Sequence, residues 1–150
     1  VALTVFTSRE APRTKRDAIR RHGADLEDTA PTYDDAERLA KTFARETNAT
    51  FISPYNHADV IAGAGTIGLE LVEDAPEAGQ ILVPVGGGGL VSGIAIAVKS
   101  LAPATQVIGV EVEASHPFQT SLAAGRITEI TVDGVLLKHT IFRFNLGNGL

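Results

Sequence analysis

Four consecutive glycines, Gly86–Gly89, are the residues of this sequence best suited to bind an anion. They follow the apolar run Gln80–Val85, which is typical of a buried strand, and they precede a helical stripe that begins at Leu90. Glycine has no Cβ and adopts positive φ angles, so successive backbone N–H groups can turn toward one ligand. The positive end of the following helix dipole adds to this attraction. The pattern predicts that a phosphate group binds to the main chain of Gly86, Gly87, Gly88 and Gly89.

On the residues alone, two alternatives to this phosphate loop stay open, a dinucleotide-binding loop and a plain turn. A Walker loop is excluded, because no Gly-Lys-Ser/Thr follows the glycines. Residues 87–92 do give G-x-G-x-x-S, and Glu111 ends the next strand, about where a ribose-binding acid would stand in a dinucleotide fold. The other alternative is a flexible turn between strand and helix that binds no ligand, although two glycines would be enough for such a turn.

A second glycine motif, Gly63-Ala64-Gly65-Thr66-Ile67-Gly68, is a literal G-x-G-x-x-G. Dinucleotide binding needs a strand directly before such a motif, and none is predicted here. The helical spacing of apolar residues from Val60 to Leu71 continues straight through the glycines. These small residues are therefore predicted to let a neighbouring element approach a helix closely.

Composition narrows the class of protein. The chain has 150 residues, a net charge of -5 and no cysteine, which excludes disulfides, thiolate metal sites and a cysteine nucleophile. The mild acidity gives no reason to expect nucleic acid, and no apolar run is long enough to span a membrane. The four histidines show no metal-ligand spacing. A cytoplasmic location with a small-molecule partner is the expectation.

The glycine segments lie in an alternation of strands and helices. Such an order predicts an α/β fold with a mainly parallel sheet. A domain boundary is expected near Ser53–Asn56. The predicted strands are 1–7, 50–53, 80–85, 106–112, 127–132 and 141–146, and the predicted helices are 12–21, a helix capped by Thr32, 57–74, 90–101 and 117–124.

Several of these segments together carry a family resemblance. The run from Val83 to Ala95 (VPVGGGGLVSGIA) resembles the glycine loop of the pyridoxal-phosphate-dependent serine/threonine dehydratases, which have the tryptophan synthase β-like fold (fold type II). The run from Asp59 to Glu70 (DVIAGAGTIGLE) is similar to a helix of that family. Weaker similarity is seen in Ala11–Lys15 with His22–Ala24, and in Val110–Glu111.

The resemblance implies a cofactor, a reaction and an architecture. Pyridoxal phosphate would bind by its phosphate at Gly86–Leu90, and the enzyme would deaminate a β-hydroxy amino acid such as threonine or serine. The fold would be a three-layer αβα arrangement, with residues 1–53 in the small domain and 54–150 in the large one, residues 133–150 being unassigned. The intact enzyme is expected to be a homo-oligomer, or this chain is expected to need the remainder of the protein.

The chain also departs from the family pattern. The Ser-x-Lys-x-Arg-Gly motif with the catalytic lysine and the Ser-x-Gly-Asn-His block are both absent, and none of Lys15, Lys41, Lys99 and Lys138 stands in such a motif. We therefore predict no catalytic residue here, and a lyase segment that is inactive alone. A non-catalytic module that binds pyridoxal phosphate or another phosphate is the alternative.

The resemblance raises a divalent cation as a secondary possibility. Some members bind one near the acid that matches Glu111, and Ser115 could offer a carbonyl. Pro117 stands where a second acid would be needed, and hard cations require several oxygen ligands. Glu111 is thus the one candidate metal ligand.

Overall fold

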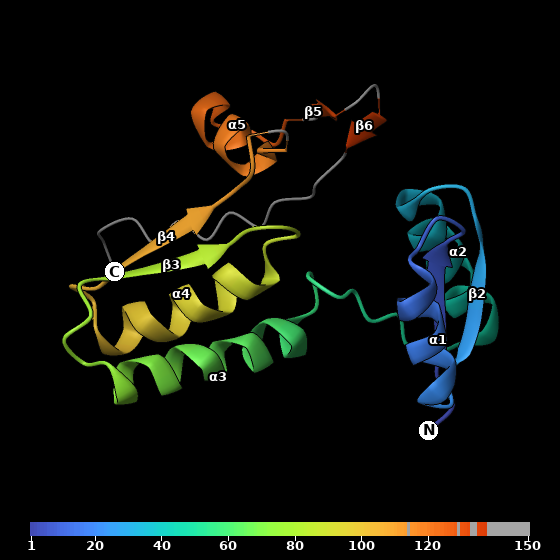
Figure 1. Ribbon diagram of the computed structural model, residues 1–150, viewed down its shortest axis with the longest axis horizontal. Coiled ribbons are helices and arrows are strands. Elements are labelled where there is room, and N and C mark those ends of the chain that lie inside the picture. Colours follow the sequence, from blue (N-terminus) through green and yellow to red (C-terminus); the bar gives the residue numbers. More distant parts are fainter. Residues whose placement is uncertain (114, 129, 133–134, 138–150) are drawn as a thin grey trace. The chain divides into compact units, whose positions relative to one another are not determined.

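The computed structural model describes residues 1–113, 115–128, 130–132 and 135–137. The chain divides after Phe51 into two compact units (Figure 1). Each unit alternates strands and helices around a parallel pair of strands, so the predicted α/β fold class is confirmed.

In the first unit, β1 (Thr4–Ser8) pairs in parallel with β2 (Asp25–Ala30). The connection between them is α1 (Arg13–Arg21), and α2 (Tyr33–Thr47) follows. The rings of Phe6 and Phe43 lie 5.5 Å apart, so α2 packs on β1 through an aromatic pair.

The helix ends of this unit follow the signals in the sequence. Gly23 has φ of +76°, as expected for a glycine just beyond a helix end. The hydroxyl of Thr32 accepts a hydrogen bond from the backbone N–H of Asp35 at 3.1 Å. Thr32 is therefore the N-cap of α2, as predicted.

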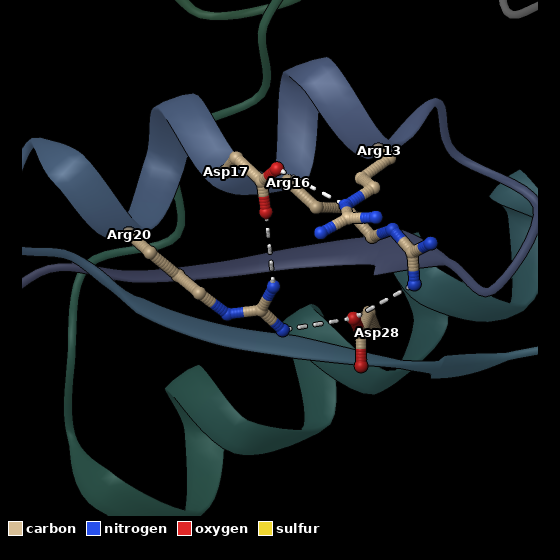
Figure 2. Close-up of polar contacts among 5 residues, drawn as sticks. All are labelled: Arg13, Arg16, Asp17, Arg20 and Asp28. Carbon is tan, nitrogen blue, oxygen red and sulfur yellow. Dashed lines mark hydrogen bonds and ion pairs between the residues drawn. The ribbon is translucent and has the colours of Figure 1, made fainter.

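Strand β2 was not predicted from the sequence. Its segment, DLEDTA, holds three acids, and Asp28 lies on the inward side together with Leu26 and Ala30. Figure 2 shows why the acid is tolerated, because Arg16 and Arg20 of α1 both reach Asp28 Oδ2, at 3.3 and 3.2 Å. The two ion pairs offset the cost of partly burying this carboxylate. Because the segment is so polar, it lacks the apolar alternation by which a strand is predicted.

The strand predicted at Thr50–Ser53 is wrong. None of the described residues pairs with this segment, which is irregular. Instead the buried Ser53 accepts a hydrogen bond at its hydroxyl from the N–H of Asn56, at 3.1 Å. This local turn, with Pro54 inside it, competes with pairing in a sheet.

In the second unit, β3 (Gln80–Pro84) and β4 (Gln106–Val110) pair in parallel with unbroken register. Helix α4 (Gly89–Leu101) lies against this pair, and α3 (Ala58–Asp74) lies against α4 (Figure 1). Val83, Ile94 and Val98 form the core between sheet and helix. Both helices lie on one side of the sheet.

The second glycine motif, Gly63–Gly68, serves helix packing, as predicted, at two of its three glycines. A Cβ at Gly65 would lie 3.3 Å from the carbonyl oxygen of Gly93 on α4. A Cβ at Gly68 would lie 2.8 Å from that of Ala97. Gly63 faces open space, so the packing role predicted for it is wrong.

The remaining described elements are α5 (Pro117–Ala124) and the antiparallel pair β5 (Ile130–Val132) and β6 (Val135–Leu137). Helix α5 ends at Gly125 with φ of +65°, as predicted. The strand predicted for 127–132 is confirmed in its last three residues, β6 was not predicted, and the strand predicted for 141–146 lies outside the described residues. No helix in the described part of the chain is long and apolar enough to cross a membrane.

Candidate anion-binding site

The glycine loop lies at the carboxyl end of the parallel pair β3–β4. The N–H of Val85 donates to the carbonyl of Val110 at 2.9 Å, which fixes the loop's start beside the end of β4. Helix α4 begins only three residues after Gly86, at Gly89, with Gly88 as its N-cap. Glu111 follows β4 at the same edge, because parallel strands end on one side of a sheet.

The backbone N–H groups of this loop have no acceptor among the described residues. None of the hydrogen bonds found there is donated by the amides of Gly86, Gly87, Gly88, Gly89 or Leu90. The carbonyl of Gly88 accepts from Ser92 at 3.0 Å, so the helical ladder starts beyond these groups. Gly88 and Gly89 are buried, and a buried amide without a partner costs free energy that an anion would recover.

Side-chain-free residues are required at three of the four loop positions. Gly88 has φ of +92°, and a Cβ there would lie 2.5 Å from Cζ of Phe118. A Cβ at Gly87 would enter the ring of Tyr55, and one at Gly89 would lie 2.8 Å from the Tyr55 carbonyl oxygen. Gly86 alone faces open space.

Tyr55 and Phe118 thus flank the loop, and sequence analysis did not predict either of them. Tyr55 precedes α3 and Phe118 lies on α5, far from the loop along the chain. The sequence shows only that Tyr55 comes before a predicted helix and that Phe118 lies within one. No spacing rule connects either residue to the glycines.

Glu111 caps α5. Its Oε1 accepts from the backbone N–H of Phe118 at 2.9 Å, and its Oε2 accepts from that of Gln119 at 2.8 Å. The role of Glu111 as a metal ligand gains no support, because no group of three or more His, Asp and Glu side chains able to hold a metal occurs in the described part. Pro117, where a second acid would be needed, is the first residue of the helix.

Two of the lysines have structural partners. The ammonium of Lys99 donates to the carbonyls of Pro103 and Thr105, at 3.0 and 2.8 Å, and so closes the end of α4. Lys41 pairs with Glu37 and lies over the ring of Phe51. Lys15 is exposed on α1, and Lys138 lies outside the described residues.

A cavity of about 620 Å³ opens along α3 and α4. None of the residues that line it belongs to the glycine loop. Its walls are almost entirely apolar, with Ile61, Leu69 and Ile96 among them, and no charged side chain contributes. Such a lining suits an apolar side chain and not a phosphate. The glycine loop therefore stays the predicted anion site.

Comparison with known families bears on the dinucleotide hypothesis for the glycine loop. The family described as pyridoxal-phosphate dependent enzymes matches residues 1–144. The chain belongs to this family. The dinucleotide hypothesis for residues 87–92 is thereby left without support, and the cofactor of the family, pyridoxal phosphate, carries the phosphate that the loop was predicted to bind.

Individual members of the pyridoxal-phosphate family are similar to most of this chain. An L-threonine ammonia-lyase of Thermotoga maritima is 38% identical over 143 residues, covering 92% of this chain and 36% of the relative. A serine racemase of Oryza sativa is 37% identical, covering 82% of this chain and 36% of the relative. The solved structure of threonine deaminase isoform 2 from Solanum lycopersicum superposes with a TM-score of 0.81 at 31% identity, covering 87% of this chain and 38% of that one.

The similarity to solved structures also supports the predicted three-layer architecture. Because the solved relatives are fold type II enzymes, the described α3–α4 side and the β3–β4 pair correspond to part of the three-layer αβα arrangement. The chain spans about 36% of the length of the curated relatives it matches first.

Proposed function

We propose that this chain supplies the cofactor-phosphate loop of a pyridoxal-phosphate-dependent lyase that deaminates β-hydroxy amino acids. The observation that carries the proposal is the set of five successive amides, Gly86 to Leu90, with no acceptor among the described residues. Similarity to threonine ammonia-lyases supports the reaction class, and similarity to a serine racemase leaves racemisation as the second candidate.

The loop residues fit a phosphate dianion without a fixed cation. The five N–H groups supply donors, and the 13-residue helix α4 points its positive end at the same place. Gly88, in the left-handed conformation, turns its backbone in a way that a residue with Cβ would resist. Tyr55 and Phe118 pack against the loop and help exclude water from it.

The chemistry that the cofactor supplies when bound is stabilisation of the electron pair left after removal of an amino acid's α-proton. This chain's own contribution is to bind and orient the phosphate. With Lys41 and Lys99 held in structural contacts, we assign the catalytic lysine to a part of the enzyme outside this chain.

The two compact units support an assignment to domains. We assign residues 1–53 to the small domain and residues 54–150 to the large cofactor domain, in a cytoplasmic homo-oligomeric enzyme. The division between the units falls after Phe51, close to the proposed boundary. The amino-acid substrate is threonine or serine on this proposal, since both carry the β-hydroxyl that the reaction removes.

The test uses two substitutions at Gly86 in the intact protein. Gly86 lacks a positive φ and an added Cβ would meet nothing within 4 Å, so Gly86→Asp and Gly86→Asn are the substitutions that the loop accepts most readily. The aspartate places a negative charge beside the phosphate, and its isostere asparagine does not. We expect Gly86→Asp to weaken pyridoxal phosphate binding roughly 100-fold and Gly86→Asn far less, because unit charges a few ångströms apart repel strongly near a protein surface.

Titration calorimetry on the apo-protein measures both affinities. Equal affinities for the two variants and the wild type would refute a phosphate site at this loop. Cofactor binding without any ammonia release from threonine or serine in the intact protein would support the alternative of a non-catalytic module.

A further inference from the structure

The carboxylate of Glu111 takes the place of a helix cap that α5 otherwise lacks. The residue before α5, His116, makes no side-chain cap, and its Nδ1 pairs with the carbonyl of Glu113 at 2.7 Å. Pro117 has no N–H, so the first two amides of the helix are those of Phe118 and Gln119. Glu111 accepts one hydrogen bond from each, at 2.9 and 2.8 Å, and its charge faces the positive end of the helix.

Phe118, whose N–H is bonded to Glu111, also contacts the glycine loop through its ring. The ring of Phe118 stands where a side chain on Gly88 would be, 2.5 Å from an ideal Cβ position. Gly88 is the loop residue with positive φ and the N-cap of α4. The backbone N–H of Phe118 is thus held by Glu111, while its ring bears on the residue that turns the loop.

We infer that Glu111 is a positioning residue for the phosphate loop, acting through Phe118. It fixes the start of α5 at the end of β4, and the ring of Phe118 then holds Gly88 in the conformation that directs the loop amides toward one anion. The inference rests on the proposed function, since it assigns a role at that same loop. Both acceptor atoms are needed, because the two amides are bonded to different oxygens.

The test compares Glu111→Gln with Glu113→Gln in the intact protein. Glutamine keeps one acceptor but turns an NH₂ group toward the other amide, so one of the two cap hydrogen bonds and the negative charge are lost. Glu113 lies two residues further on, is exposed, and its side chain makes none of the contacts found in the described part, so its substitution removes the same charge alone. We expect Glu111→Gln to weaken pyridoxal phosphate binding about tenfold, the factor that corresponds to losing one helix cap. Glu113→Gln should leave the affinity unchanged.

Binding of pyridoxal, which lacks the phosphate, separates positioning from general damage. We expect the affinity of Glu111→Gln for pyridoxal to equal that of the wild type. An equal loss for both compounds, or no loss for either, would overturn the inference. If the wild type itself bound pyridoxal as well as pyridoxal phosphate, the proposed function would fail instead.

Phe118→Leu provides a second variant should Glu111→Gln not fold. It keeps an apolar residue on α5 but removes the ring from Gly88, and we expect the same phosphate-specific loss. Leu122→Ala on the same helix, where Leu122 is 68% exposed, is the control that should leave the affinity unchanged.

Treatment of the wild type with EDTA should also leave the affinity unchanged. A tenfold loss of affinity on chelation would assign Glu111 to a metal and overturn the inference. The effects of Glu111→Gln and Phe118→Leu should not add, since the first residue acts through the second.

Discussion

Gly88 combines two constraints, a φ angle of +92° and the ring of Phe118 at the place that a Cβ would occupy. Either constraint alone would disfavour a side chain. Alanine at this position would have to shift the loop or the ring, and the loop amides would move with it. The single left-handed residue of the loop is therefore also the one most sensitive to substitution.

We predict that Gly88→Ala lowers the free energy of unfolding by about 1–3 kcal/mol, the usual cost of forcing a residue with Cβ into such a conformation. Thermal denaturation of the intact protein, with and without pyridoxal phosphate, measures the loss. Gly86→Ala is the control, because Gly86 has an ordinary φ and open space around it. Equal stability of the two variants would show that Gly88 is not constrained as described.

Among single residues, the glycines of the loop could be predicted from the sequence, but the residues that contact them could not. Strand, glycine run and helix are contiguous, so their order was readable as a phosphate loop. Tyr55 and Phe118 reach the loop through the folded chain, and nothing in their local sequence marks them. Glu111 was visible as an acid at a strand end, and its actual partners, the amides of α5, lie seven and eight residues further along.

Among the elements, α3 and α4 cross most closely at Gly65 and Gly93. A Cβ at Gly93 would overlap the carbonyl of Ile61 and would lie 2.6 Å from the backbone nitrogen of Gly65. Backbone atoms cannot yield as a flexible side chain would. The helix pair therefore depends on Gly93 for its separation.

We predict that Gly93→Ala destabilises the protein by about 1–3 kcal/mol through overpacking, despite the better helix propensity of alanine. Urea denaturation of the intact protein gives the difference. Gly63→Ala, on the open face of α3, should be neutral or stabilise by up to about 1 kcal/mol. A stabilising Gly93→Ala would contradict the close crossing of the two helices.

Elements with plain apolar periodicity or clear caps were predictable, such as α2 after Thr32 and β3 before the glycines. Elements defined by long-range pairing were not. Strand β2 contains Asp28, which pairs with two arginines of α1, so its sequence lacks the apolar alternation of a strand. Residues 50–53 have that composition, yet the turn from Ser53 to Asn56 takes its place.

The molecule leaves an apolar sheet face uncovered by the described residues. Leu82, Ile108 and Val110 alternate with the core residues of β3 and β4 and are 65%, 37% and 45% exposed. They point away from α4, because successive strand side chains face opposite sides. Such a face fits the proposal that the remainder of a larger enzyme packs here.

We predict that Leu82→Thr together with Ile108→Thr leaves the isolated 150-residue chain no less stable, but lowers the stability of the intact protein by at least about 2 kcal/mol, since apolar side chains buried there would lose that burial. Differential scanning calorimetry on both forms makes the comparison. Cooperative, monomeric unfolding of the isolated chain would count against an incomplete fold. Equal losses in both forms would mean that nothing covers this face.

The most direct test of the central claim is hydrogen exchange of the loop amides in the intact protein. The amides of residues 86–90 have no acceptor in the described structure, whereas that of Val85 is bonded to Val110. On addition of pyridoxal phosphate, exchange at 86–90 should slow by at least about tenfold, as for newly hydrogen-bonded amides, with little change at Val85. Saturating cofactor that leaves exchange at 86–90 unchanged would show that the phosphate binds elsewhere.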